Sequence, residues 1–242
     1  MFKEKIIPAG KVIYSDLLPD LEHFFTTRES VIRSAEIDVD DNINSICKYL
    51  NIERNDFISP VQTHSTNVKY AVSKITDYPD TDGLIIDNYE QAVYLNFADC
   101  TPVILYDSRQ NIGAVVHAGW RGTVGRIVPK AVGIMAAESG TRAEDLYALI
   151  GPAIGMCCYK VGYEVIDGIR SSVRDSSGLV SSDGRVDLKQ TNARQLIECG
   201  VKESNTDICP YCTSCRRDMF FSYRKENGTT NRHSAVIRLR RK

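Results

Sequence analysis

Two histidines and one cysteine occupy positions at which a protein chain can hold a catalytic metal ion. His64 follows an apolar segment that contains Pro60, Cys100 lies between two expected strands, and His117 ends a run of apolar residues. Functional side chains concentrate at such strand ends, because the strands fix their position while the adjoining loops leave access. Two imidazoles and one thiolate suit Zn²⁺ and leave a fourth coordination position open.

The spacing of these three residues does not by itself establish a metal site. The separations are far longer than those of a zinc finger. The same residues would also fit a protein core, with hydrogen-bonded histidines and an unreactive cysteine. Spacing alone favours this second interpretation, so the sequence immediately around each residue has to decide between the two.

The sequence around these residues, and further along the chain, contains six distinctive segments. They are Val61-Gln-Thr-His64, Thr81-Asp-Gly83, Asn96-Phe-Ala-Asp-Cys100-Thr-Pro-Val, Val116-His-Ala-Gly-Trp-Arg-Gly122, Gly151-Pro-Ala-Ile-Gly155-Met-Cys-Cys-Tyr and Phe220-Phe-Ser-Tyr-Arg224. Together they resemble the YfiH family of laccase-domain proteins, once called polyphenol oxidases. The resemblance runs from about Phe24 to Leu239, nearly the whole chain.

This resemblance implies a fold, a metal and a reaction. The fold is a single compact α+β domain over residues 1–242, with mixed sheets flanked by helices, and the metal is zinc held by His64, Cys100 and His117. The activities are phosphorolysis of purine nucleosides (adenosine, inosine, guanosine and methylthioadenosine) and deamination of adenosine. Purine nucleoside and phosphate are then the partners. The sequence departs from the family pattern just after Arg28 and at Thr230-Asn-Arg232.

Two aspartates are candidates for moving protons. One thiolate against Zn²⁺ leaves a positive charge that lowers the pKa of a bound water to about 7. Attack of that water on adenine then needs a carboxylate to carry protons. Asp99 is the nearest candidate in the sequence, and Asp82 is a second. Each of the two could instead cap a turn.

Phosphorolysis requires cations that hold phosphate beside the ribose. Arg121 lies between glycines ahead of an expected helix, where a guanidinium can bind an anion. Arg28 and Arg224 are further candidates, and each could instead form a structural ion pair. Gln62, in the segment that carries His64, is assigned to substrate binding. Trp120 is either a base-stacking residue or a plug of the core.

Two other enzyme readings and one non-enzyme reading compete with this one. A copper-dependent polyphenol oxidase would need several His-x-His motifs for a multicopper centre, and the chain has four histidines and no such motif. The sequence is compatible with copper as well as zinc at the single His64, Cys100 and His117 site. Cys100 paired with His117 would also suit a cysteine hydrolase, in which the thiolate is the nucleophile. A binding protein that kept the fold without turnover is the remaining alternative.

The other cysteines form a weaker pattern. Cys209, Cys212 and Cys215 follow Cys-x-x-Cys spacing, but they supply three ligands and only His233 is nearby as a fourth. We therefore expect no firm metal site there, and we expect the neighbouring Cys157 and Cys158 to pack in the core.

Composition excludes several classes of protein. A net charge of −1 argues against general nucleic-acid or membrane-surface binding. The start of the chain lacks the apolar region of a signal peptide, and no apolar run approaches the length of a membrane span. We expect a cytoplasmic protein whose cysteines stay reduced.

Hydrophobic patterns predict a mixture of strands and helices without strict alternation, which is typical of the α+β class. Strands are expected at 12–14, 23–27, 83–86, 92–97, 102–106, 112–117, 148–150, 219–223 and 235–239, the last two joined as a hairpin around Asn227-Gly228. Helices are expected at 41–50, 123–138, 163–171 and 188–199.

Overall fold

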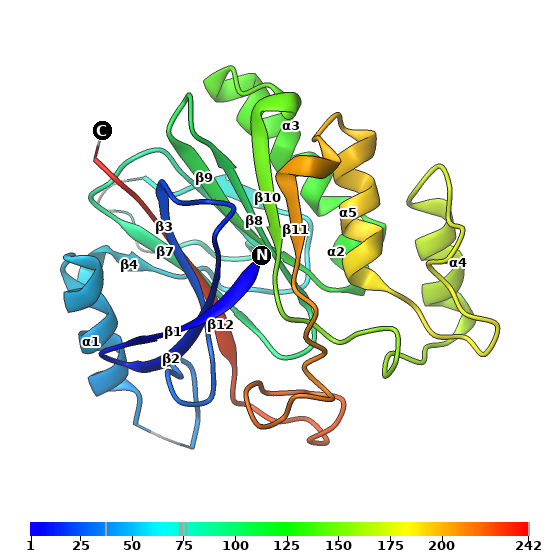
Figure 1. The fold of residues 1–242 in the computed structure, drawn as a ribbon, viewed down its shortest axis with the longest axis horizontal. Coiled ribbons are helices and arrows are strands. Elements are labelled where there is room, and N and C mark those ends of the chain that lie inside the picture. The colour runs from blue at the N-terminus through cyan, green and yellow to red at the C-terminus, as the bar shows by residue number, and fades with distance from the viewer. Residues whose placement is uncertain (37, 73–74, 76, 242) are drawn as a thin grey trace.

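A computed structural model of the chain describes residues 1–241 apart from 37, 73–74 and 76. Its main feature is a pair of six-stranded sheets packed face to face (Figure 1). Apolar side chains of both sheets meet in one core, among them Phe25 and Leu95 from the first sheet and Ile104 and Val115 from the second. This architecture confirms the predicted α+β class with mixed sheets.

The first sheet contains the N-terminal strands and the last strand of the chain. Its neighbours are antiparallel except for the pairing of β4 with β7. In spatial order the strands are β1 (Phe2–Ile7), β2 (Gly10–Ser15), β3 (Leu21–Thr26), β12 (His233–Leu239), β7 (Ala92–Phe97) and β4 (Phe57–Ile58).

The second sheet carries most of the functional site. It has an antiparallel centre and a parallel pair at each edge. In spatial order its strands are β11 (Thr206–Ile208), β10 (Leu146–Ile150), β8 (Thr101–Asp107), β9 (Ile112–Ala118), β6 (Gly83–Ile86) and β5 (Val68–Tyr70).

Helices cover the outer faces of the sheets. Helix α1 packs on the first sheet, and α3 and α5 pack on the second (Figure 1). Because β8 and β9 lie between the other sheet and these helices, every residue of both strands is buried, which accounts for the apolar runs 102–106 and 112–116 within them. The helices are α1 (Asp40–Leu50), α2 (Trp120–Val124), α3 (Ile127–Ser139), α4 (Tyr163–Ser171) and α5 (Leu188–Glu198), with single 3₁₀ turns η1 (Arg54–Asp56), η2 (Ala143–Asp145) and η3 (Glu203–Asn205).

Most predicted elements are present, but two predictions are wrong. The single helix expected at 123–138 is two helices, because Gly125 ends α2 and Arg126 adopts a left-handed backbone with φ 57°. The strand expected at 219–223 is a loop, because the backbone closes into turns there: the N–H groups of Met219 and Phe220 donate to the carbonyl of Arg216, and no strand in the described part of the chain pairs with them. The expected terminal hairpin is therefore absent, and β12 pairs with β3 and β7.

In the described part of the chain, no helix has the length and apolar character that crossing a membrane would require.

Candidate metal centre and active site

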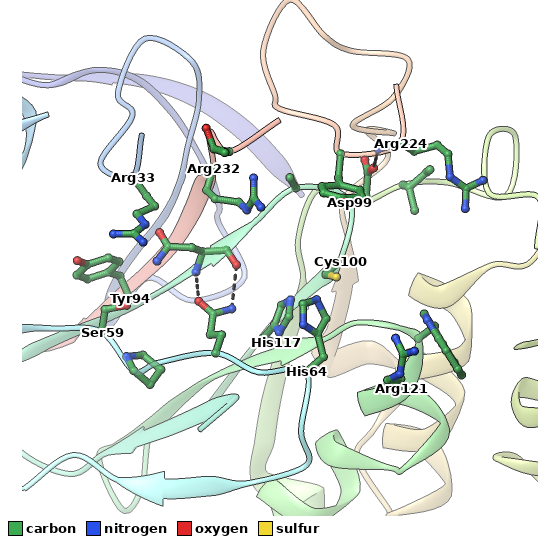
Figure 2. Close-up of a pocket in the computed structure, with 18 of the residues that line it drawn as sticks. Arg33, Ser59, His64, Tyr94, Asp99, Cys100, His117, Arg121, Arg224 and Arg232 are labelled. Atoms are coloured by element: carbon green, nitrogen blue, oxygen red, sulfur yellow. Dashed lines mark hydrogen bonds between the residues drawn. The ribbon is translucent and has the colours of Figure 1, made fainter. Parts of the chain in front are cut away.

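The structure brings His64, Cys100 and His117 together, and we call these three residues the trio. Their donor atoms all lie within 4.8 Å of one another, and the two imidazole rings meet edge to face with centroids 4.9 Å apart. The antiparallel register of β8 and β9 sets Pro102 opposite His117, so Cys100, just before β8, lies beside the end of β9. His64 arrives from the loop between β4 and β5 (Figure 2).

Asp82 holds two parts of the trio in place from behind. Its buried carboxylate accepts a 2.7 Å hydrogen bond from Nδ1 of His117, which leaves Nε2 of that ring free for a metal. The same carboxylate accepts the backbone N–H groups of Thr63, His64 and Ser65 at 3.1, 3.1 and 2.7 Å. It thus stabilises the turn in which His64 adopts a left-handed φ of 63°. Asp82 does not line the pocket, so its geometry is that of a positioning residue.

Gly119 allows the trio to close. A Cβ atom at this position would lie 2.9 Å from Sγ of Cys100 and 3.3 Å from Cδ2 of His64. Real Cβ atoms do not approach other atoms so closely, so only glycine fits at this position without moving Cys100 or His64.

Without a bound metal ion, Cys100 and His117 form a thiolate–imidazolium pair, and a metal ion that binds there would displace the proton on Nε2 of His117. Burial by itself would raise the pKa of the Cys100 thiol, but the charge and hydrogen bond of His117, with the hydrogen bond of His64, lower it to about 6. Burial would lower the pKa of His117, but the charge of Cys100 and the hydrogen bond to Asp82 raise it to about 9. Burial also opposes ionisation of Asp82, yet its contacts with His117 and Ser65 hold its pKa well below the usual range. A thiolate is therefore present at neutral pH without any metal.

The trio lies in the wall of a pocket with a volume of about 1170 Å³. Among the described residues that line it, Asp99 is the one carboxylate. Asp99 has a left-handed φ of 84°, and its two oxygens accept 2.7 Å hydrogen bonds from Oγ1 of Thr213 and the backbone N–H of Arg224. These bonds hold the carboxylate turned toward Arg224, while the sulfur of the neighbouring Cys100 points toward the two histidines (Figure 2).

Arginines line the pocket on both sides of the trio (Figure 2). On one side the Arg121 guanidinium lies over Trp120, 4.3 Å from the ring centroid, and Asp99, the one carboxylate among the described lining residues, bonds Thr213 and the backbone of Arg224 instead. Arg224 lies on the same side, with Nη1 donating to the carbonyl of Lys160. Arg33 and Arg232 lie on the other side.

Arg28 does not line the pocket. It pairs with Glu226, donates to the carbonyl of Phe220 and stacks on Phe221. The structure therefore places this predicted phosphate ligand in the alternative role, a structural ion pair. Gln62 does line the pocket, but its amide makes 2.9 and 2.8 Å hydrogen bonds with the backbone of Asn96 in β7.

Arg33, Arg232 and Tyr159 are among the lining residues that sequence reasoning did not assign to the site. Arg33 and Arg232 are brought side by side by an isolated β-bridge between distant segments, a pairing that no local pattern reveals. Tyr159 follows the Cys157-Cys158 pair, and its position within a distinctive segment was a usable signal. Burial and the nearby charges of Cys100 and Asp99 raise the pKa of Tyr159 to about 12, so its hydroxyl stays a proton donor.

A second group of potential metal ligands corrects the expectation for the other cysteines. The Sγ atoms of Cys157, Cys158, Cys212 and Cys215 all lie within 4.8 Å of one another. Neither Cys209 nor His233 belongs to this group; both are buried elsewhere in the fold. Cys157 is exposed and Cys158 is half-buried, so the prediction that this pair packs in the core is wrong.

Comparisons with known proteins define the family. A family model described as multi-copper polyphenol oxidoreductase laccase matches residues 30–240, so the chain belongs to that family. The crystal structure of the hypothetical protein YfiH of Bacillus licheniformis superposes with a TM-score of 0.88 at 28% identity, over 95% of this chain and 96% of that one. The predicted resemblance is thereby confirmed.

Curated relatives carry enzyme names. Purine nucleoside phosphorylase YlmD of Geobacillus stearothermophilus is 38% identical over 167 residues, 67% of this chain and 61% of that protein's length. Adenosine deaminase RL5, from an unknown prokaryotic organism, is 28% identical over 248 residues, 91% of this chain and 94% of that protein. The predicted enzyme class agrees with these names.

Proposed function

We propose that this protein is a zinc-dependent purine nucleoside phosphorylase that also deaminates adenosine. One observation carries the proposal: two imidazoles and one thiolate converge in the wall of a pocket that also presents arginines without carboxylate partners. The pocket volume of about 1170 Å³ leaves room for a nucleoside and a phosphate together. The names of the relatives point to the same two reactions.

The donor set of the trio fits zinc. A thiolate and two neutral imidazoles are preferred ligands of Zn²⁺, and three protein ligands with an open position are typical of catalytic sites. Asp82 on Nδ1 of His117 supplies the carboxylate that orients a metal-binding histidine. When bound there, a zinc ion supplies a Lewis acid that polarises an oxygen and activates water near neutral pH.

The phosphate site in this proposal is centred on Arg121. Its guanidinium is held flat on Trp120, at the rim of the pocket close to the trio, and can present two N–H groups to an anion. Arg224, on the same side, adds positive charge. Phosphorolysis then joins a phosphate oxygen to C1′ of the ribose, breaks the bond from C1′ to the purine nitrogen, and returns a proton to the purine.

Tyr159 and Asp99 are placed to handle that proton and the one in deamination. The raised pKa of Tyr159 makes it a hydrogen-bond donor to a purine nitrogen that gains negative charge. Asp99 is the carboxylate of the pocket that can take a proton from water as it adds to C6 of adenine, and pass it to the departing ammonia. Arg121 has no part in this second reaction, because no phosphate is consumed.

The decisive experiment is incubation of the zinc-loaded protein with adenosine, with and without phosphate. We expect adenine and ribose 1-phosphate only when phosphate is present, and inosine in both cases. Absence of all three products would contradict the proposal. Arg121→Gln should raise the KM for phosphate about 10-fold or more, the loss of a charge-assisted bond of about 1.5–3 kcal/mol, and leave deamination unchanged.

Arg109→Gln is the matched control, since this exposed arginine pairs with Asp145 outside the pocket.

We also place the protein in the cytoplasm in this proposal, because its eight cysteines are free thiols, which need a reducing compartment.

A further inference from the structure

Four cysteine thiols gather at the surface beside the rim of the pocket, and we call them the cysteine cluster: Cys157, Cys158, Cys212 and Cys215. Sγ of Cys215 lies 3.5 Å from that of Cys158 and 3.7 Å from that of Cys157. We propose that this cluster binds a single zinc ion through four thiolates, as a structural site separate from the trio. The proposal is independent of the proposed function.

The fold brings the two cysteine pairs together by extending a parallel strand pair. Strands β10 and β11 lie side by side (Figure 1). Beyond their ends the backbones stay paired: the N–H of Cys209 donates to the carbonyl of Ile150, and that of Thr213 to the carbonyl of Ala153. A parallel bridge sets Ala153 opposite Cys212. The cluster is therefore fixed by backbone hydrogen bonds and does not depend on flexible side chains.

The distances fit a tetrahedral metal ion. Four sulfurs at about 2.3 Å from one zinc ion lie about 3.8 Å apart, close to the 3.5 and 3.7 Å found here. A disulfide would need about 2.05 Å and would use only two thiols. A [4Fe–4S] cluster would attach each thiolate to a different iron, and a [2Fe–2S] cluster would attach two thiolates to each of two irons; either arrangement would spread the sulfurs further than a single ion does.

Backbone contacts support the sulfur atoms of the cluster. The backbone N–H of Gly155 points at Sγ of Cys212, with a separation of 3.2 Å, and so supplies a hydrogen bond that favours the ionised sulfur. Gly155 itself packs against the cluster, since a Cβ there would lie 3.3 Å from Sγ of Cys157. The Arg216 guanidinium, next to Cys215 in the sequence, is paired with Asp218 and stacks on Tyr211, so it is held away from the sulfurs by its own contacts.

Zinc in the cluster would stabilise one wall of the pocket. Thr213, next to Cys212, donates the hydrogen bond that holds Asp99, and Tyr159, next to Cys158, lines the pocket. Both segments carry residues of the reaction proposed above, yet none of the four cysteines lines the pocket. The inferred role of the ion is to hold these two loops in register.

Metal content tests the proposal directly. Zinc per chain, measured by mass spectrometry on protein purified under reducing conditions, should be one ion higher than the trio alone accounts for. Cys100→Ala should lose the ion of the trio and keep the other. Adding Cys157→Ser and Cys215→Ser to that variant should remove the remaining ion, whereas adding Cys199→Ser, outside both groups, should not.

X-ray absorption at the zinc edge gives a readout that needs no change to the cluster. In Cys100→Ala we expect a shell of sulfur alone at about 2.3 Å; the unaltered protein, an average of the two sites, should show sulfur mixed with nitrogen. Hydrogen exchange in 151–160 and 209–216 should rise several-fold in the paired-serine variant. The proposal would be overturned if Cys100→Ala contained no zinc, or if its zinc had a shell of nitrogen or oxygen. Bound iron or a disulfide within the cluster would overturn it as well.

Discussion

The trio and the cysteine cluster are two thiol-bearing sites built by different parts of one sheet. The trio sits at the ends of the central strands β8 and β9, where strand register and the carboxylate of Asp82 fix it. The cluster sits beyond the edge pair β10 and β11, on two loops held by backbone hydrogen bonds. The trio offers three donors of mixed type inside a pocket. The cluster offers four thiols of one type, of which Cys157 and Cys215 are exposed and Cys212 is buried.

This contrast separates a site with an open coordination position from a site that is closed. Three ligands leave room for water or substrate, whereas four thiolates complete a tetrahedron and leave none. The position of each site agrees with its number of donors, because only the trio faces the pocket.

The largest expected effect separates the two sites by activity. Cys100→Ala should lower turnover by about 10³-fold or more, because a Lewis acid contributes several kcal/mol and each 1.36 kcal/mol is tenfold in rate. The variant with Cys157→Ser and Cys215→Ser should keep kcat within about threefold at saturating substrate. Steady-state assays at fixed zinc measure both. An equal loss in both variants would erase the distinction between an open and a closed site.

The next effect concerns the residue behind the trio. Asp82→Asn should weaken zinc binding at the trio by about 10- to 100-fold, the usual cost of losing the group that orients a metal-binding histidine. Competition with a zinc-binding dye measures this affinity, and excess zinc should restore much of the activity. Asp80→Asn is the matched control, because Asp80 bonds Thr63 and Asn67 in the same loop without touching His117.

Two glycines give a matched pair of smaller effects. Gly119→Ala would place a Cβ 2.9 Å from Sγ of Cys100, whereas Gly155→Ala would place one 3.3 Å from Sγ of Cys157. We expect the first change to weaken the trio's zinc affinity about tenfold and the second to weaken the cluster's only about two- to threefold, costs of about 1.4 and 0.5 kcal/mol. Zinc competition on each variant measures both. The reverse order would show that the cluster is the more rigid site.

The smallest effect is a difference in thiol reactivity in the metal-free protein. Since Cys100 has a pKa of about 6, it is a thiolate above that pH, and its alkylation rate should rise from pH 5 to a plateau near pH 7. The hydrogen bond with Cys158 raises the pKa of Cys215, so its rate should still be rising at pH 9. Peptide mass spectrometry after brief iodoacetamide treatment follows both. Bound zinc should slow the alkylation of Cys100. If Cys100 is alkylated just as rapidly in the presence of zinc, the result would favour the interpretation of the protein as a cysteine hydrolase.

The sequence predicted the trio but not the cluster, for a physical reason. The trio was recognisable because each member stands in a distinctive segment, although its spacing alone favoured core residues. The cluster depends on the parallel pairing of β10 with β11, and nothing in the local sequence of Cys157-Cys158 announces that Cys212 will lie beside it. Long-range pairing likewise hid the approach of Arg33 to Arg232.

The predictions for the fold failed where local pattern and tertiary packing disagree. The run Met219-Phe-Phe reads as a strand, yet the backbone N–H groups of Met219 and Phe220 donate to the carbonyl of Arg216 in a turn. The apolar pattern across 123–138 reads as one helix, yet the left-handed Arg126 divides it, and Gly122 and Gly125 pack closely on Ile127 and Thr66. For Asp82, the sequence left catalysis and turn capping open; the structure shows it capping the turn and orienting His117 at once.

The pairing of β10 with β11 also bears on the order of folding. Between the two cysteine pairs the chain runs through α4 and α5, and Cys158 and Cys215 are 57 residues apart in the sequence. A cross-link closing a loop of that length in the unfolded chain costs about 4 kcal/mol of chain entropy. An ion held by the cysteine cluster would therefore enter only after the parallel pair has formed. Because the ion would bind after this step, it would mainly slow the unfolding of α4 and α5 and so extend the lifetime of the native state.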